Sequence, residues 1–346
     1  MMRKPLMAYL MIALLAPVVQ AGEPGISDDG QARVSFAGNG QQLNDFIGRG
    51  VALADFNGDG ALDAFVVNEA GSNSRFHLYV GDGRGEFSEG GSPWESPREM
   101  AKPIVHDVNG DGSRDVVVGR TAWLNDGHGR FTADRSRFLD SDGVMVWHCQ
   151  LADLNMDGLI DVFAIVMANG ETRGRVYLND DRGCFRYIGK PLGQKIQAAV
   201  ALGDVNGDGF PDAVISGWRN AEADSCPNRV FFNDGQGRFA DSGQIFDEGM
   251  RHSHGLALGD LDKDGDLDLG LVTQNAPFAR LFLNDGKGRF AAGRTLGTCQ
   301  VEKVAVIDLN GDGSLDILLA CIGPNEVWLN DGQGGFSDSG LRLGAE

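Results

Sequence analysis

A chain of 346 residues with 42% apolar content is long enough to bury a large core but too short for more than about two ordinary domains, unless it forms one repetitive array. The 49 acidic residues outnumber the 30 basic ones and give a formal charge of −19, which argues against nucleic acid and anionic lipid as partners. This acidic excess indicates a cationic partner instead.

Residues 1–21 have the features of a cleavable signal peptide. Two basic residues precede an apolar run over residues 6–19, which is too short to span a membrane, and a small residue, Ala21, ends the segment. No Cys directly follows Ala21 to carry a lipid anchor, and no later apolar stretch reaches the ~20 residues of a membrane span. We therefore expect an exported protein, secreted or periplasmic, in which residues 22–346 form a single domain without membrane insertion.

The rest of the chain contains five Cys residues, at positions 149, 184, 226, 299 and 321. In an oxidising compartment an odd number leaves at least one thiol unpaired or paired between molecules. Disulfides are therefore expected to be an addition to the fold and not its main framework.

One nine-residue pattern, Asp-x-Asn-x-Asp-Gly-x-x-Asp, recurs six times, with Asp in place of Asn in one copy. The copies begin at Asp55, Asp107, Asp153, Asp204, Asp260 and Asp308. The steps between these starts are 52, 46, 51, 56 and 48 residues. A period of about fifty residues excludes short calcium-roll repeats and fits one propeller blade per copy.

Each copy has the same local pattern of strands and turns. An apolar run such as residues 51–54 leads into the Asp loop, and a run rich in β-branched residues such as 116–118 leaves it. A third run precedes a turn, as in Trp123-Leu-Asn-Asp-Gly-His-Gly-Arg-Phe131, where Asn and Gly tolerate the positive φ angles of tight hairpins. Each copy therefore predicts four short antiparallel strands.

Six such sheets predict an all-β propeller, because one four-stranded sheet cannot bury both faces whereas radially packed sheets share a core. The 51 Gly residues and the lack of a 3.6-residue apolar period disfavour helical repeats. Residues 28–36 look like a degraded turn and fourth strand, yet the last copy also has a complete turn ending at Phe336. Either this N-terminal strand completes or doubles the last blade, or a seventh blade is partial; six blades are preferred, with seven as the alternative.

The Asp loop has the spacing of a calcium site. In the first copy, the side chains of Asp55, Asn57 and Asp59 can fold around one centre. The backbone carbonyl of Ala61 and the carboxylate of Asp63 would complete the six to eight oxygen ligands that calcium takes. The Gly at the sixth position of the loop allows the sharp turn that such a site needs.

The equivalent ligands in the other copies are Asp107, Asn109, Asp111, Ser113 and Asp115; Asp153, Asn155, Asp157, Leu159 and Asp161; Asp204, Asn206, Asp208, Phe210 and Asp212; Asp260, Asp262, Asp264, Asp266 and Asp268; and Asp308, Asn310, Asp312, Ser314 and Asp316. Five copies with three Asp and one with four, at the side-chain ligand positions, bring 19 carboxylates together in small groups that repel one another without cations. About six calcium ions would add 12 positive charges against the −19, so metal binding is expected to contribute to folding.

Turn formation alone and magnesium binding are the alternatives to calcium in these loops. Asp, Asn and Gly are ordinary turn formers, but six copies with the same four oxygen positions argue against turns alone. Magnesium is less suitable than calcium, because it prefers strict octahedral geometry with retained waters.

These Asp loops, followed by Asn-Asp-Gly-x-Gly-x-Phe turns, resemble the FG-GAP/VCBS repeat family, whose propeller repeats also occur in the integrin α headpiece. The resemblance covers roughly residues 30–340. It implies calcium between the first and second strands of each blade, and ligand binding in integrin-like members on the opposite face. Arg114 and Pro211 replace the usual aliphatic residue, and Asp181 replaces the turn Gly, so those blades are expected to bind their ion or pack less well. No integrin-type stalk is visible, so receptor signalling is not implied.

If the first strand of each blade lines the propeller axis, its first residues lie opposite the calcium loops. The side chains predicted to form this ligand rim are Arg49, Lys102, Trp147, His148, Gln197, Trp218, His252, His254 and Glu302. Such a rim suits a carbohydrate or an extracellular protein, so the protein is predicted to be a recognition or adhesion module. The alternative is that loop positions are polar everywhere and the His are incidental. Trp123 and Trp328 occupy third-strand positions and are expected to pack the sheet.

An enzyme is the second hypothesis, in the form of an extracellular lyase or hydrolase acting on polysaccharides. His148, His252, His254 and Glu302 are the residues that could approach one another near the axis. No nucleophile elbow, zinc-protease motif or Cys-His signature supports catalysis, so no catalytic residue is assigned.

One disulfide is predicted, between Cys299 and Cys321. Cys299 lies nine residues before Asp308 and Cys321 lies thirteen residues after it, so a hairpin places both at the same end of adjacent antiparallel strands. Cys149, Cys184 and Cys226 show no obvious pairing.

Overall fold

The computed structural model describes residues 48–70, 73–91, 93–97, 102–137, 144–180, 183–193, 197–217, 227–246, 253–273 and 279–343. The predicted signal peptide and the strand predicted at residues 28–36 lie outside this part of the chain. The described residues form 25 β-strands and no α-helix, and so include no helix that could cross a membrane. They belong to two compact units, which divide between Asp134 and Arg135.

Unit 1 contains two antiparallel sheets. Blade 1 has the strand order β1-β2-β3-β4, and β5 pairs with β3 as a fifth strand. Blade 2 has the order β6-β7-β8-β9. Their bounds are β1 (Gly48–Ala54), β2 (Asp63–Ala70), β3 (Asn73–Gly81), β4 (Phe87–Glu89), β5 (Trp94–Pro97), β6 (Ile104–His106), β7 (Asp115–Val118), β8 (Thr121–Asn125) and β9 (Phe131–Asp134).

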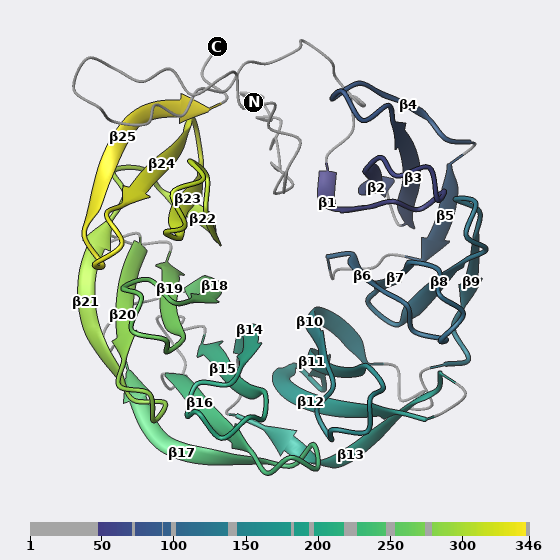
Figure 1. Cartoon of the computed structure of the whole chain (residues 1–346). Coiled ribbons are helices and arrows are strands. Elements are labelled where there is room, and N and C mark those ends of the chain that lie inside the picture. The colour runs from purple at the N-terminus through teal and green to yellow at the C-terminus, as the bar shows by residue number, and fades with distance from the viewer. Residues whose placement is uncertain are drawn as a thin grey trace, which may run out of the picture. The chain divides into compact units, whose positions relative to one another are not determined.

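Unit 2 contains four sheets of four antiparallel strands, blades 3 to 6, each with its strands in chain order. The bounds are β10 (Met145–Ala152), β11 (Asp161–Ala168), β12 (Glu171–Asn179), β13 (Phe185–Leu192), β14 (Gln197–Gly203), β15 (Asp212–Gly217), β16 (Asn228–Asn233), β17 (Phe239–Phe246), β18 (Ser253–Gly259), β19 (Asp268–Thr273), β20 (Ala279–Asn284), β21 (Phe290–Leu296), β22 (Val301–Ile307), β23 (Asp316–Cys321), β24 (Asn325–Asn330) and β25 (Phe336–Leu343). Within this unit the first strands β10, β14, β18 and β22 lie next to one another in that order (Figure 1).

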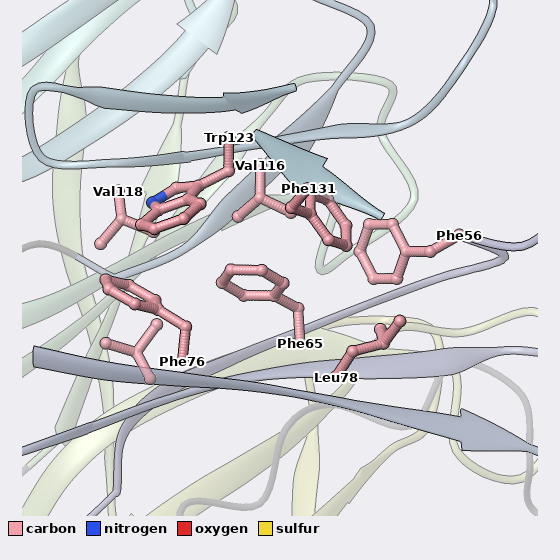
Figure 2. Packing of buried hydrophobic residues seen from close by; sticks show 9 residues of the cluster. Phe56, Phe65, Phe76, Leu78, Val116, Val118, Trp123 and Phe131 are labelled. Atoms are coloured by element: carbon pink, nitrogen blue, oxygen red, sulfur yellow. The ribbon is translucent and has the colours of Figure 1, made fainter. Parts of the chain in front are cut away.

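Consecutive blades within a unit share a hydrophobic core. The second strand of a blade is a continuous apolar run because both faces are covered; β7, β15 and β19 are buried at every position. In unit 1, Phe65 and Phe76 of blade 1 pack against Trp123 and Phe131 of blade 2 (Figure 2). Unit 2 has equivalent shared clusters for blades 3 and 4, 4 and 5, and 5 and 6.

The fold class is therefore the one predicted, an all-β propeller of six blades with four strands in chain order, to which blade 1 adds β5. Trp123 is buried in the core of unit 1, and Trp328 packs, half-buried, against the core of blades 5 and 6. The prediction that both Trp residues pack the sheet is confirmed.

Candidate metal centres and ligand rim

The six Asp loops connect the first strand of each blade to the second, at one end of the blade. Their residue ranges are 55–63, 107–115, 153–161, 204–212, 260–268 and 308–316. The loop turns sharply at its fourth and sixth positions, where Gly58 and Gly60 have φ angles of 78° and 86°. Met156 and Lys263 take the fourth position in blades 3 and 5 and are held at φ 61° and 62°, which is costly for residues with a side chain.

The first Asp of the loop organises the backbone around its carboxylate. Asp55 Oδ1 accepts the N–H groups of Gly58 and Asp59 at 2.7 and 3.2 Å, and Oδ2 accepts that of Gly60 at 2.9 Å. Asp107 and Asp204 make the same three hydrogen bonds in blades 2 and 4. The loop is thus preformed around a carboxylate that still has lone pairs for a cation.

The third and fifth positions are linked to each other. Asn57 Nδ2 donates to Asp59 Oδ2 at 2.8 Å, and the backbone N–H of Asp59 donates to Asn57 Oδ1 at 2.9 Å. The same pair of bonds forms in blades 2, 3, 4 and 6. The side chains at positions one, three and five are therefore held on one side of the turn.

The last Asp of each loop is fully buried, and both of its oxygens accept backbone N–H groups. In blade 4, Asp212 Oδ2 accepts the N–H of Val205 at 3.2 Å, and Oδ1 accepts the N–H of Asn233, the last residue of β16, at 2.9 Å. This carboxylate ties the loop to the third strand, a role that sequence reasoning missed. The pKa of this carboxyl is raised to about 6 at Asp115, Asp161, Asp212 and Asp268, mainly because the group is buried. The neighbouring carboxylates of the loop also raise the pKa, whereas the two backbone hydrogen bonds lower it.

The donor set of these loops fits a hard divalent cation. Each loop offers carboxylate oxygens at positions one, five and nine, an amide or carboxylate oxygen at position three, and a carbonyl at position seven, which is the kind of oxygen shell that calcium takes. In blade 5, Asp260, Asp262 and Asp268 each place one oxygen within 4.8 Å of the others. One of the buried oxygens, Asp260 Oδ1, has no hydrogen-bond partner among the described residues.

The predicted ligand rim lies at the opposite ends of the blades, where every first strand except β6 has a β-bulge. Arg49, Trp147, His254 and Glu302 each occupy the extra, unbridged residue of a bulge in β1, β10, β18 and β22. Ala198 has this place in β14, next to Gln197. Bulges are common next to functional sites because they redirect one side chain, and sequence alone contains no clear signal for them.

The structure describes some of the rim side chains and not others. Trp147 is 41% exposed, His148 is half-buried and accepts the Val200 N–H at Nδ1 (3.4 Å), and Lys102 and Glu302 are half-buried. The side chains of Arg49, Gln197 and His254 are not described, and Trp218 and His252 lie outside the described residues. In unit 2, the backbone places Trp147, Gln197, His254 and Glu302 at the same end of four neighbouring first strands. A catalytic group of His148, His252, His254 and Glu302 stays a prediction.

Comparison with known families identifies the repeat. A family model described as FG-GAP-like repeat matches residues 55–118, 107–164, 153–215 and 204–271, which together make up more than half of the chain. The chain belongs to the FG-GAP-like repeat family. Each match begins at the first Asp of a loop and ends in the second strand of the following blade, and the structure extends the same pattern to the loop at 308–316. No curated protein is similar enough in sequence to match the chain.

One solved structure similar to this FG-GAP-like protein supports the fold. A crystal structure of a protein from Lactobacillus plantarum is 11% identical, with a TM-score of 0.60, and the similarity covers 84% of this chain and 83% of that one. An exotype rhamnogalacturonan lyase, YesX, and a Bacillus licheniformis rhamnogalacturonan lyase are 16% and 15% identical, with TM-scores of 0.46 and 0.44. The similarity covers 87% and 86% of this chain but only 56% and 57% of the lyases.

The Asn of the Asn-Asp-Gly turn links neighbouring FG-GAP-like repeats, which the sequence did not suggest. Asn284 Nδ2, at the end of β20, donates to the carbonyl of Val205 in the blade 4 loop (2.8 Å) and to that of Leu267 in its own loop (3.1 Å). Asn125, Asn233 and Asn330 make the equivalent pairs of bonds. The recurrence of Asn before the turn is the one sequence signal for this link, and turn chemistry alone also accounts for it.

Two of the residues that depart from the repeat pattern, Arg114 and Pro211, keep the hydrogen bond to the Asn of the turn. Arg114 and Pro211 take the place of an aliphatic residue, and each supplies its backbone carbonyl to the Asn side chain, as Leu267 does. This bond does not depend on the side chain, and weaker ion binding or packing in these blades stays a prediction. Asp181 lies outside the described residues.

A disulfide joins Cys299 and Cys321 in blade 6, with their Cα atoms 5.8 Å apart. Val301 pairs with Cys321 at the end of the β22–β23 hairpin, which is the strand geometry from which the pairing was predicted. Cys149 is buried, Cys184 is half-buried, and Cys226 lies outside the described residues.

Proposed function

We propose that this protein is an exported, calcium-binding β-propeller that recognises a carbohydrate or an extracellular protein. The observation that carries the proposal is the contrast between the two ends of the blades. One end has oxygen donors at the same positions in all six loops. The other end has a different residue in each bulge, including the exposed Trp147.

Calcium would serve as part of the framework. The 49 acidic residues exceed the basic ones, and 19 carboxylates occupy ligand positions in the loops, so the folded chain without cations concentrates negative charge at one end of each blade. Each loop also joins the first two strands of its blade, and a bound ion would hold both strand ends.

Thermal unfolding of the full mature chain, with calcium and with EDTA, tests this part of the proposal. A site held at about 100 times its Kd adds about 2.7 kcal/mol to the free energy of unfolding, so several sites raise the Tm strongly. We expect a large increase in Tm with calcium that EDTA reverses. Equal Tm values under both conditions would contradict the proposal.

Recognition at the opposite end is supported by an aromatic side chain that the fold leaves open to solvent. Trp147 is 41% exposed on a bulge, and a Trp presents a large apolar face together with an N–H donor, as sugar and protein ligands require. Ligands would be identified on glycan and extracellular-protein arrays. We expect Trp147→Ala to weaken binding at least about tenfold, as for an interface hot spot.

A matched control lies in the same strand. Met145 is 39% exposed and belongs to β10 but does not occupy the bulge, so Met145→Ala should leave binding unchanged. Equal binding by the wild type and Trp147→Ala would remove the rim from the proposal.

Export is supported by the signal-peptide features of residues 1–21 and by the disulfide of blade 6, because disulfides persist in oxidising compartments. N-terminal sequencing of the protein recovered from the source cells should begin at Gly22. A sequence that still begins at Met1 would contradict export through this peptide.

A further inference from the structure

The blade 5 loop differs in charge from the other five. Its third position is Asp262, where the other loops have Asn, and its seventh position is Asp266. With Asp260, Asp264 and Asp268 the loop has five carboxylates, and its single basic residue is Lys263.

The replacement of Asn by Asp removes an internal hydrogen bond. In the other five loops the Asn side chain donates to the carboxylate at position five, at 2.8 to 2.9 Å. Asp262 has no such donor, and its Oδ1 accepts the N–H of Asp264 at 3.3 Å. Asp264 Oδ1 accepts the backbone N–H of Asp266 at 2.9 Å, but its carboxylate has no side-chain amide donor, which leaves it more available to a cation than the equivalent carboxylates.

The first Asp of this loop also lacks a bond that its equivalents make. Asp55 Oδ1 and Asp204 Oδ1 each accept two backbone N–H groups. Asp260 Oδ1 is buried without a partner among the described residues, while Asp260 Oδ2 accepts the N–H of Gly265 at 3.2 Å. A buried carboxylate oxygen without a donor is unfavourable unless a cation compensates it.

The carboxylates of this loop converge, and the positive charge of Lys263 does not pair with them. Asp260, Asp262 and Asp268 each place an oxygen within 4.8 Å of the other two. No ion pair joins Lys263 to these acids in the described part of the chain, and its Nζ lies 3.3 Å from the place that a Cβ on Gly332 of blade 6 would take. The blade 5 loop therefore has the greatest repulsion between carboxylates, and the ammonium group of Lys263 points to blade 6 and does not neutralise it.

We propose that the blade 5 loop is the dominant cation site of the protein, which binds calcium more tightly than the other five loops and fills first. The inference rests on the proposed calcium function and adds a rank order among the sites. Its physical reason is that calcium affinity rises with the number of charged ligands, and this loop has one more carboxylate in its ligand shell than any other.

Calorimetric titration of the chelator-stripped, full mature chain with calcium chloride tests the rank order. The wild type should show one step that is at least about tenfold tighter than the rest. Asp262→Asn, which restores the sequence pattern of the other loops, should remove this step and leave the weaker ones. Thermal unfolding in EDTA shows whether that variant is folded.

The matched variant is Asn206→Asp, which places the extra carboxylate in the blade 4 loop and should create a second tight step. Six indistinguishable steps in the wild type, a tight step that survives Asp262→Asn, or no new step in Asn206→Asp would each overturn the rank order and leave calcium binding itself intact. Absence of calcium binding in all variants would overturn the proposed function as well.

Discussion

The two ends of each blade are built in different ways. At the loop end, the last Asp of each loop accepts the equivalent two backbone N–H groups in all six blades. The Asn of the turn bonds to the loop of the preceding blade within each unit. At the opposite end, five of the six first strands have a bulge, but the bulge residue changes from Arg49 to Trp147, Ala198, His254 and Glu302.

This difference shows which parts of the repeat are constrained by the fold. A residue whose side chain completes a backbone hydrogen bond in a buried place cannot change without leaving that group unpaired. A bulge residue, which does not pair with the neighbouring strand, completes no such hydrogen bond, so its identity can vary with the ligand. Four variants test this interpretation, beginning with the one for which we expect the greatest change in stability.

The largest effect is expected at the loop end, from Asp212→Ala in EDTA. The change leaves the N–H groups of Val205 and Asn233 buried without acceptors, at about 1–3 kcal/mol each, so the free energy of unfolding should fall by about 4 kcal/mol. Urea unfolding measures it. The exposed turn residue Asp234 is the control, since water can replace its bonds, and Asp234→Ala should cost about 1 kcal/mol. Similar losses in both variants would contradict the structural role of Asp212.

The next largest effect concerns the opposite end of blade 6. The Cys299–Cys321 disulfide closes a loop with a sequence separation of 22, and its removal by Cys299→Ser with Cys321→Ser should lower the free energy of unfolding by about 3 kcal/mol through loop entropy. Non-reducing peptide mapping and urea unfolding check the bond and its effect. Cys184→Ser, at a half-buried site, should have little effect. Two free thiols at positions 299 and 321 would refute the bond.

A smaller effect is expected from Asn284→Ala, which removes the link between blades 4 and 5. The carbonyls of Val205 and Leu267 lose their donor, so the free energy of unfolding should fall by about 2 kcal/mol. Lys287→Ala, three residues along the same turn and exposed, is the control and should be neutral. Unchanged stability of Asn284→Ala would mean that water replaces the link.

The smallest effect, of opposite sign, is expected from Met156→Gly. Met156 is 55% exposed and is held at φ 61°, so Gly relieves backbone strain without loss of packing, partly offset by the greater freedom of Gly in the unfolded chain. We expect a gain below about 1 kcal/mol in urea unfolding. Met145→Gly, within the strand β10 and not in a turn, should destabilise instead. A loss in Met156→Gly would show that the side chain contributes more than the strain costs.

Local sequence determined the repeats, the four strands of each blade and the oxygen donors of the loops. Turn formers, apolar runs and alternate Asp and Asn residues act over a few neighbouring positions, so the printed order of residues contains them. The Cys299–Cys321 disulfide is also predictable from the sequence, because a single hairpin brings the two residues together.

The contacts between blades and the positions of the bulges follow from the tertiary structure and not from local sequence. Asn284 bonds to a carbonyl 79 residues away, and no local pattern distinguishes that bond from an ordinary turn. The second role of Asp212, as an acceptor for a strand 21 residues later, and the placement of Lys263 against Gly332 depend in the same way on how sheets pack. Such contacts join residues that are distant in the chain, and their geometry is set by the shared cores and not by neighbouring residues.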